Sequence, residues 1–105
     1  MVPSLTRRKL TVQGKRFSRE ELFRVRNQVS INEVIEEIVD LPCKIRDGHL
    51  RFVCPVCSES NTATNPKTNL ARCFRCRKNF NPIDMVMLVR GAGFVEAVQC
   101  LKEHL

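Results

Sequence analysis

The spacing of apolar residues along the chain separates helical stretches from an extended middle. Before Pro42 the apolar residues recur at steps of three and four, which is the period of a helix with one buried face. Between Cys43 and Phe52 they alternate with polar residues, which is the period of a strand with two different faces. After Pro82 the apolar residues follow one another almost without interruption, as in a buried helix. The pattern predicts an α+β chain in which a small sheet lies between two helical regions.

Capping signals set the ends of the two amino-terminal helices. Ser18 followed by Glu21 is a capping box, which predicts a helix that runs to about Gln28. A second box begins at Ser30 and starts a helix that Pro42 ends. The apolar face of this second helix consists of Ile31, Val34, Ile35, Ile38 and Val39. We expect this face to pack against the sheet.

The dipeptide Asp47-Gly48 predicts a two-residue turn of type I′ in a hairpin that runs from Cys43 to Phe52. Pairing Arg46 with His49 sets the register, and strand alternation then separates two faces. The apolar face is expected to hold Cys43, Ile45, Leu50 and Phe52, and the basic face Lys44, Arg46, His49 and Arg51. Like charges opposite one another repel, so a bound anion would explain the basic face, whereas a solvated surface is the simpler alternative.

Helix signals return near the carboxyl end. Asn81 and Pro82 suit the N-cap and first position of a helix over residues 82–90, and Gly91 suits its end. This helix is apolar nearly all round, so we expect it to be largely buried. A last helix is expected over residues 94–104, with Phe94, Ala97, Val98 and Leu101 on one face.

Four cysteines form two C-x2-C pairs, Cys54 with Cys57 and Cys73 with Cys76, separated by fifteen residues. Each pair can form a tight turn that presents two thiolates, so two pairs at this separation predict one tetrahedral metal site. One structural Zn2+ ion is the expected occupant, because four thiolates close its shell and leave no position for a substrate. Iron in a rubredoxin-like centre is the chemical alternative, since iron also accepts four thiolates.

The remaining candidate ligands have simpler interpretations. Cys43 is expected to be a small core residue, because four better-spaced cysteines already complete the shell. His49 lies beside the hairpin turn on the polar face and is expected to be solvated. Cys100 falls off the apolar face of the last helix and is expected to have no role at the site.

Length and composition indicate one folded domain in a reducing compartment. The amino terminus lacks the apolar segment of a signal peptide, and the longest apolar run, residues 85–89, is far too short to span a membrane. We therefore expect a cytoplasmic location, without a membrane partner and with cysteines that bind metal. Residues 1–17 carry five Arg or Lys and no acid, and we expect a flexible basic arm there, followed by the zinc-ribbon domain over residues 18–105.

The net charge of +7 is concentrated in particular segments. Residues 42–80 carry eight basic against two acidic side chains, whereas residues 18–41 carry three against six. Concentrated positive charge favours a polyanionic partner.

Near the second cysteine pair, Arg72, Arg75, Arg77 and Lys78 surround Phe74. This mixture suits a single strand of nucleic acid, although Phe74 in the core is the alternative.

Several segments together carry a family resemblance. They are Val29-Ser-Ile-Asn-Glu-Val-Ile35, Phe52-Val-Cys-Pro-Val-Cys57-Ser-Glu59, Cys73-Phe-Arg-Cys76, Ile83-Asp-Met-Val-Met87 and Phe94-Val-Glu-Ala97. In this order they resemble the amino-terminal zinc-binding domain of bacterial and phage DNA primases, over about residues 20–105. Many of these domains have His at the position of Cys57. The glycines usual after the last ligand are replaced here by Arg77, Asn79 and Phe80.

The resemblance implies a zinc ribbon that packs against flanking helices and binds single-stranded template DNA. It also implies that a separate primase or polymerase catalytic domain, or a helicase, is a partner in primer initiation during DNA replication. The residues assigned by position to DNA are Lys44, Arg46, Arg51, Arg72, Arg75, Arg77 and Lys78, with Phe74 as a candidate for base stacking. The chain itself is expected to be non-catalytic, because its carboxylates are scattered along the sequence and a Gly-rich phosphate loop is missing.

Two other functions fit the same residues. A zinc-ribbon adaptor would bind a protein partner through the carboxy-terminal helices, and it would expose an apolar patch beside residues 85–88. A regulatory DNA- or RNA-binding ribbon unrelated to priming would prefer a duplex to a single strand.

Overall fold

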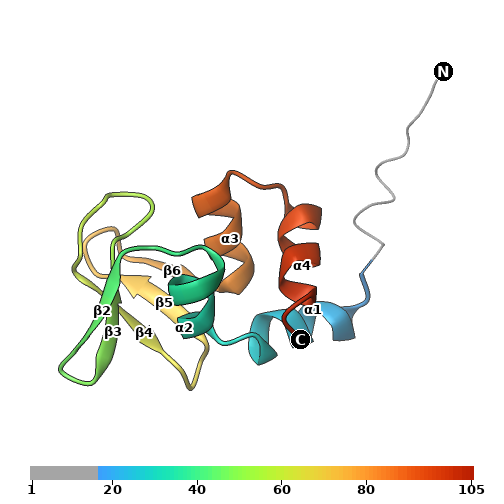
Figure 1. Cartoon of the computed structure of the whole chain (residues 1–105), viewed down its shortest axis with the longest axis horizontal. Coiled ribbons are helices and arrows are strands. Elements are labelled where there is room, and N and C mark those ends of the chain that lie inside the picture. Colours follow the sequence, from blue (N-terminus) through green and yellow to red (C-terminus); the bar gives the residue numbers. More distant parts are fainter. Residues whose placement is uncertain (1–16) are drawn as a thin grey trace.

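The computed structural model describes residues 17–105 as an α+β structure, with the strands at one end and most of the helices at the other (Figure 1). The elements are α1 (Arg19–Gln28), α2 (Ile31–Glu33), the π-helix η2 (Val34–Ile38), β2 (Cys43–Arg46), β3 (His49–Phe52), β4 (Thr62–Asn65), β5 (Leu70–Cys73), β6 (Lys78–Phe80), α3 (Pro82–Arg90) and α4 (Phe94–Lys102). The predicted fold class is confirmed. None of the helices in residues 17–105 has the length and apolar character needed to cross a membrane.

The predicted amino-terminal arm lies outside the described residues, except for Phe17. The Phe17 side chain is buried and packs edge-on against Phe94 of α4, with ring centroids 6.5 Å apart. The ammonium group of Lys102 lies 5.5 Å from the centre of the Phe17 ring. Phe17 therefore belongs to the folded part, one residue earlier than the predicted boundary, because its ring has an apolar partner on α4.

The predicted capping signals start both amino-terminal helices. At α1, the Ser18 hydroxyl accepts a hydrogen bond from the Glu21 N–H, and the Glu21 carboxylate accepts one from the Ser18 N–H. At α2 one half of the predicted box forms, in which the Ser30 hydroxyl accepts from the Glu33 N–H. The helix ends at Asp40, which adopts a left-handed conformation with φ of 53°.

The second predicted helix is confirmed in position but not in its internal geometry. One α-helical turn widens into η2, where the Val39 N–H donates to the Val34 carbonyl five residues earlier. A single wide turn of this kind is a recognised variation within helices. All five predicted face residues, Ile31, Val34, Ile35, Ile38 and Val39, are buried. The prediction of a buried apolar face is therefore confirmed.

The hairpin forms in the predicted register. Arg46 pairs with His49, Ile45 with Leu50 and Cys43 with Phe52, and both turn residues have positive φ, as a type I′ turn requires. Leu50 and Phe52 are buried, but Ile45 is 65% exposed. Ile45 pairs with Leu50 on the predicted apolar face, but it lies on the outer strand of the two-stranded sheet, where it remains uncovered.

A second, three-stranded sheet is built from β4, β5 and β6 in that order. The strand β6 was not expected from the sequence pattern. The hydroxyl of Thr62 joins this sheet to the hairpin, since it donates to the Phe52 carbonyl at 2.6 Å and accepts from the Phe52 N–H at 2.8 Å. Thr62 is fully buried, so the two sheets meet at a dry contact.

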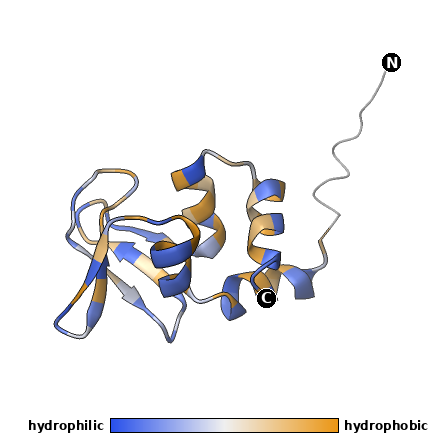
Figure 2. Ribbon diagram, in the orientation of Figure 1, coloured by the Kyte–Doolittle hydropathy of each residue, from blue (hydrophilic) through white to orange (hydrophobic). Residues whose placement is uncertain are grey.

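The helices α3 and α4 complete the core. Asn81 caps α3 through a full capping box with Asp84, and Gly91 ends it in the left-handed conformation, as predicted. Figure 2 shows that α3 is hydrophobic over most of its length. Its first two turns are buried, but Leu88 is 46% exposed. The expectation that α3 is largely buried therefore fails in its last turn.

Asn69 connects the sheet to the helical part. It lies in the turn before β5, with φ of 57°, and it is buried. Its amide nitrogen donates to the carbonyls of Arg26 and Val29, and its amide oxygen accepts from the Ile31 N–H at 2.8 Å. One side chain therefore satisfies backbone groups at the end of α1 and at the start of α2.

Candidate metal centre and nucleic-acid face

The two predicted cysteine pairs form two turns of the same shape. In the first, the Cys54 carbonyl accepts from the Ser58 N–H at 2.9 Å, and in the second the Cys73 carbonyl accepts from the Arg77 N–H at 2.8 Å. Ser58 and Arg77 occupy equivalent positions and both adopt left-handed backbone, with φ of 64° and 60°. Each turn thus carries its two cysteines towards the other turn.

The four sulfur atoms gather into one cluster. The Sγ atoms of Cys54 and Cys76 are 3.8 Å apart, and those of Cys57 and Cys73 are 3.6 Å apart. All four lie within 4.8 Å of one another. Four thiolates around one zinc ion, at about 2.3 Å from it, would be about 3.8 Å apart. The donor set and its spacing therefore fit one tetrahedral zinc ion.

Backbone amides donate hydrogen bonds to two of the four sulfur atoms. The Val56 N–H donates to the Cys54 sulfur and the Cys76 N–H to the Cys73 sulfur, each at 3.4 Å. In both pairs the first cysteine is buried and the second is partly exposed. The amides stabilise negative charge on the two buried sulfurs, which are the less hydrated pair.

Contacts among the thiols move their pKa values in opposite directions. Burial raises the pKa of Cys73, but hydrogen bonds from the Cys76 N–H and from the Cys57 thiol outweigh it and lower that pKa to about 7. Hydrogen bonding with Cys57, followed by burial, raises the pKa of Cys76 to about 12. The cluster alone therefore retains protons, which a metal ion displaces when it binds the thiolates.

The other candidate ligands lie away from the cluster. Within residues 17–105, the four cysteines form the one group of three or more Cys, His, Asp or Glu side chains that could hold a metal ion. Cys43 packs against the hydrophobic core and His49 is exposed, as predicted. The sulfur of Cys100 lies 4.0 Å from the guanidinium of Arg90, outside the cluster.

The family model of the CHC2 zinc finger, the DnaG-type zinc ribbon, matches residues 17–105. The chain belongs to the CHC2 zinc-finger family. This membership confirms the predicted resemblance to the primase zinc ribbon, and with the cysteine cluster it identifies zinc as the cofactor. Cys57 supplies a fourth thiolate in this CHC2 zinc finger. A comparison with curated proteins gave no match.

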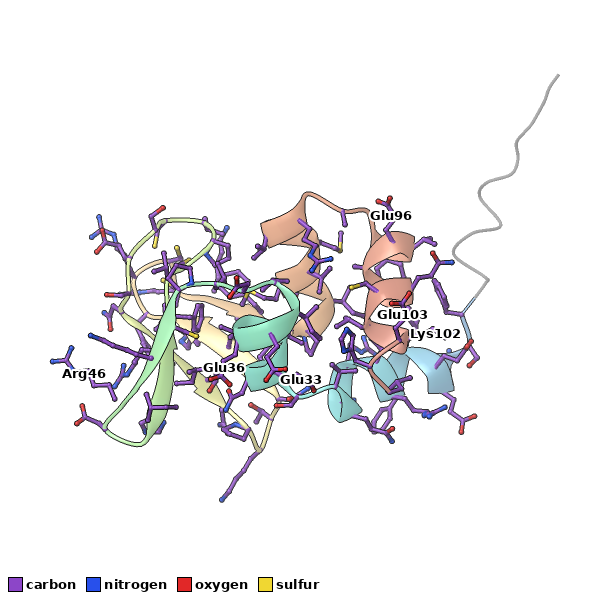
Figure 3. All side chains as sticks on the ribbon, in the orientation of Figure 1. Glu33, Glu36, Arg46, Glu96, Lys102 and Glu103 are labelled. Atoms are coloured by element: carbon purple, nitrogen blue, oxygen red, sulfur yellow. The ribbon has the colours of Figure 1, made fainter. Side chains whose placement is uncertain are left out.

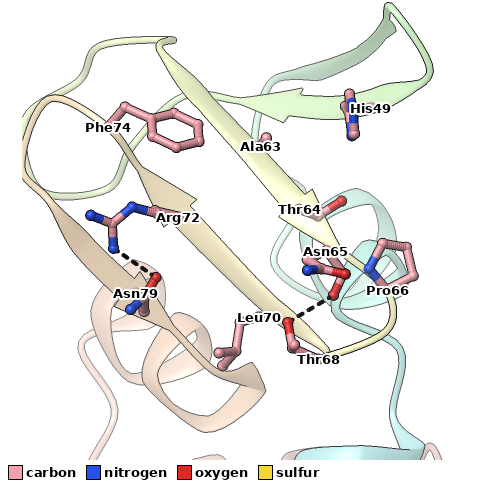
Figure 4. A pocket seen from close by; sticks show the side chains of 10 residues that line it. All are labelled: His49, Ala63, Thr64, Asn65, Pro66, Thr68, Leu70, Arg72, Phe74 and Asn79. Carbon is pink, nitrogen blue, oxygen red and sulfur yellow. Dashed lines mark hydrogen bonds between the residues drawn. The ribbon is translucent and has the colours of Figure 1, made fainter.

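The solvent-facing side of the three-stranded sheet holds a groove of about 400 Å³, called here the sheet groove (Figure 4). It is lined by His49, Ala63, Thr64, Asn65, Pro66, Thr68, Leu70, Arg72, Phe74 and Asn79. Arg72 pairs across the strands with Ala63 and Asn79, so these three side chains share the exposed face. Most of the exposed surface that lines the groove belongs to apolar atoms, and Arg72 is the cation among the lining residues.

Phe74 and Arg72 make a cation–π contact in the sheet groove. The guanidinium carbon of Arg72 lies 5.8 Å from the centre of the Phe74 ring. The Phe74 side chain is 47% exposed, whereas Phe80 is 3% exposed. Phe80, which follows the second cysteine pair, is therefore a core residue, whereas Phe74, which lies between Cys73 and Cys76, is open to a ligand.

A second groove of about 330 Å³, the hairpin groove, is polar and basic. It is lined by Lys44, Arg46, Asp47, Arg51, Ser60 and Asn61. Arg51 is partly buried, because one of its terminal nitrogens donates to the Thr62 carbonyl at 2.9 Å, whereas Arg46 projects away from the helices (Figure 3). The cross-strand partners Arg46 and His49 line one groove each, so the two grooves come near each other at the hairpin tip.

The structure divides the seven basic residues predicted to contact DNA into two groups. Lys44, Arg46, Arg51 and Arg72 line the two grooves. Arg75, Arg77 and Lys78 are exposed on or after the second cysteine turn and line neither groove. The sequence analysis missed Asn79 and Leu70 as groove residues. Asn79 pairs with Arg72 across β5 and β6, so its position could have been found only if β6 had been expected, whereas Leu70 pairs with Asn65 across β4 and β5.

Proposed function

We propose that this CHC2 zinc finger binds single-stranded template DNA across its two grooves and supports the initiation of primers in DNA replication. The observation that carries the proposal is the exposed Phe74 ring, in cation–π contact with Arg72, in an apolar groove beside a basic groove. Bases can stack on an exposed aromatic ring, while neighbouring cations neutralise the phosphates. The family to which the chain belongs supports a nucleic-acid partner.

The apolar lining of the sheet groove favours a single strand over a duplex. In a duplex the base faces are stacked on one another, and the phosphates form the outer surface. A purely electrostatic partner of duplex DNA would need cations across the whole face, whereas here Leu70, Ala63 and Pro66 line the same groove as Arg72. An unpaired strand can turn its bases towards these apolar side chains.

We further propose that the chain is non-catalytic and works with a separate catalytic domain or a helicase in the cytoplasm. The zinc shell of four thiolates leaves no coordination position for a substrate, so the ion supports the fold and the sheet face. The acidic residues Asp40, Asp47, Glu59 and Asp84 come from four different segments of the chain. All six cysteines are free, which suits a reducing compartment.

Fluorescence anisotropy with the zinc-loaded full chain tests the proposal. A labelled single-stranded oligonucleotide and the corresponding duplex are compared over a series of salt concentrations. We expect tighter binding of the single strand. For each phosphate contact, the slope of log affinity against log salt should change by about 0.7 for the single strand.

Three sets of substitutions with equal charge change locate the interface. The groove set changes Lys44, Arg46 and Arg72 to Gln; the turn set changes Arg75 and Lys78 to Gln and Arg77 to Asn, which tolerates positive φ. The control set changes Arg19, Arg24 and Arg26 of α1 to Gln. The groove set should lose the most affinity and salt dependence. Equal losses in the groove and control sets, or feeble binding by the unchanged protein, would contradict the proposal.

A further inference from the structure

Arg72 is held in one orientation within the sheet groove. One terminal nitrogen of its guanidinium donates to the amide oxygen of Asn79 at 3.1 Å, and its opposite neighbour is the Phe74 ring (Figure 4). Arg72 and Asn79 are also directly paired across β5 and β6, so the contact spans two adjacent strands. A side chain that is already ordered loses less conformational entropy when it binds a ligand.

The hydrogen-bonding groups that remain free in this pair are mainly donors. A guanidinium has five N–H donors and no acceptor, and one terminal nitrogen is engaged with Asn79. The amide oxygen of Asn79 already accepts from Arg72, which leaves one lone pair on that oxygen beside the two N–H donors of the amide nitrogen. The groove therefore offers a cluster of N–H groups beside an aromatic ring, and it matches a base with adjacent acceptors.

Among the four bases, guanine fits this donor cluster best. We infer that Arg72, supported by Asn79 and Phe74, makes the sheet groove selective for guanine, an inference that rests on the proposed binding of single-stranded DNA. Guanine presents two neighbouring acceptors, O6 and N7, which an arginine fork can bind together. Adenine has an amino donor beside N7 and requires a partner with both a donor and an acceptor, such as a free Asn or Gln amide.

The pyrimidines match the groove less well. On the major-groove edge, thymine offers one acceptor, its O4 atom. Cytosine offers an amino donor, N4, at the same position. Cytosine has a second edge with two acceptors, but its single ring covers less of Phe74 than a purine does. The groove volume of about 400 Å³ leaves room for a purine. The expected order therefore has guanine first and cytosine second.

The test compares oligothymidines that carry one central guanine, cytosine or adenine, with the all-thymine strand as the reference. Anisotropy with the zinc-loaded full chain should show about fivefold or tighter binding of the guanine strand, the lower limit for a bidentate Arg–guanine pair. Replacing the guanine by 7-deazaguanine removes the N7 acceptor and should abolish most of the preference.

Two charge-conserving variants separate recognition of the base from attraction to phosphates. Arg72→Lys keeps the positive charge but removes the fork, so it should bind all four strands with similar affinity. Arg75→Lys, on the neighbouring turn and outside the groove, should retain the guanine preference. Zinc content measured for both variants confirms that the metal centre is intact.

The outcomes distinguish this inference from the proposed function. Strong but equal binding of all four strands, or a preference for cytosine, would overturn the inference while single-strand binding stands. A guanine preference that persists in Arg72→Lys would overturn it as well. Failure of the wild-type protein to bind any of the strands would overturn both.

Discussion

Between Cys43 and Phe80 the strands are only three or four residues long, whereas the helices around them bury a continuous apolar core. The helical part contributes most of the largest buried side chains, including Ile31, Ile35, Met85 and Leu101. The sheet part leaves its groove face to solvent, so that each strand can bury side chains on one face only. The burial of apolar side chains can stabilise the packing of the helices. We expect the short strands to depend in addition on the zinc ion bound by the four cysteines. The comparison shows two sources of stability in one short chain.

Removal of the zinc should have the largest effect, and it should be confined to the sheet part. The binding free energy of a structural zinc ion in small zinc fingers is on the order of 10 kcal/mol or more at neutral pH. We expect Cys73→Ser to lose the ion and the amide-exchange protection of β4, β5 and β6, while α1 and α4 keep measurable protection. Cys100→Ser changes a cysteine outside the cluster and should retain both metal and protection. Simultaneous loss of protection in α1 and α4 would show that the two parts are not independently stabilised.

Substitution of Asn69 should weaken the connection between the two parts. Asn69→Gly keeps a residue that tolerates positive φ but removes the side-chain hydrogen bonds to three backbone groups. We expect a loss of about 1–3 kcal/mol in the free energy of unfolding, measured by urea denaturation of the zinc-loaded protein. Asn65→Ala, in the same turn but exposed, serves as the control. A loss no larger than that of the control would mean that the buried amide does not couple the parts.

The ion pair on the surface of the helical part should have the smallest effect. Lys102 lies 2.8 Å from the Glu21 carboxylate and, with the Ser18 N–H, holds the pKa of Glu21 below its usual value of 4.5. A carboxylate with a lowered pKa binds fewer protons in the folded than in the unfolded state. Its contribution to stability is therefore present above about pH 4.5 and is lost as the pH falls through the folded-state pKa.

Glu21→Gln tests this contribution, because Gln can retain the capping box while it loses the charge. The difference in Tm between wild type and variant should be small at neutral pH and should vanish in acid, since both partners are exposed to solvent. Glu20→Gln in the same turn is the matched control. A large difference that persists in acid would show that the side-chain shape, and not its charge, stabilises α1.

The sequence was sufficient to predict the features that depend on neighbouring residues. Asp47-Gly48 set the hairpin register, and the Ser18 and Asn81 caps set two helix starts, because each of these signals acts within a few residues. The cysteine spacing likewise predicted the cluster. These elements were confirmed because local geometry alone determines them.

The features that were missed depend on residues far apart in the sequence. Exposure of Ile45 and Leu88 depends on whether another segment covers them, which apolar spacing does not reveal. The amide of Asn69 contacts residues about forty positions earlier in the chain, which no local pattern reveals. The position of Arg72 beside Asn79 required β6, a strand of three residues without a clear alternating pattern.

The outer strand of the hairpin has a consequence for self-association. Within the described residues, β2 pairs with β3 alone, and its exposed Ile45 stands between Lys44 and Arg46. An unpaired strand edge with an apolar side chain is a template for pairing with a second copy of the same strand, and flanking charges oppose such pairing. We therefore expect the two cations proposed to face phosphates to oppose pairing between free copies as well. A bound nucleic acid would neutralise these two cations and so remove their mutual repulsion between copies. Unless it also covers the edge of β2, we expect the complexes to associate through that edge.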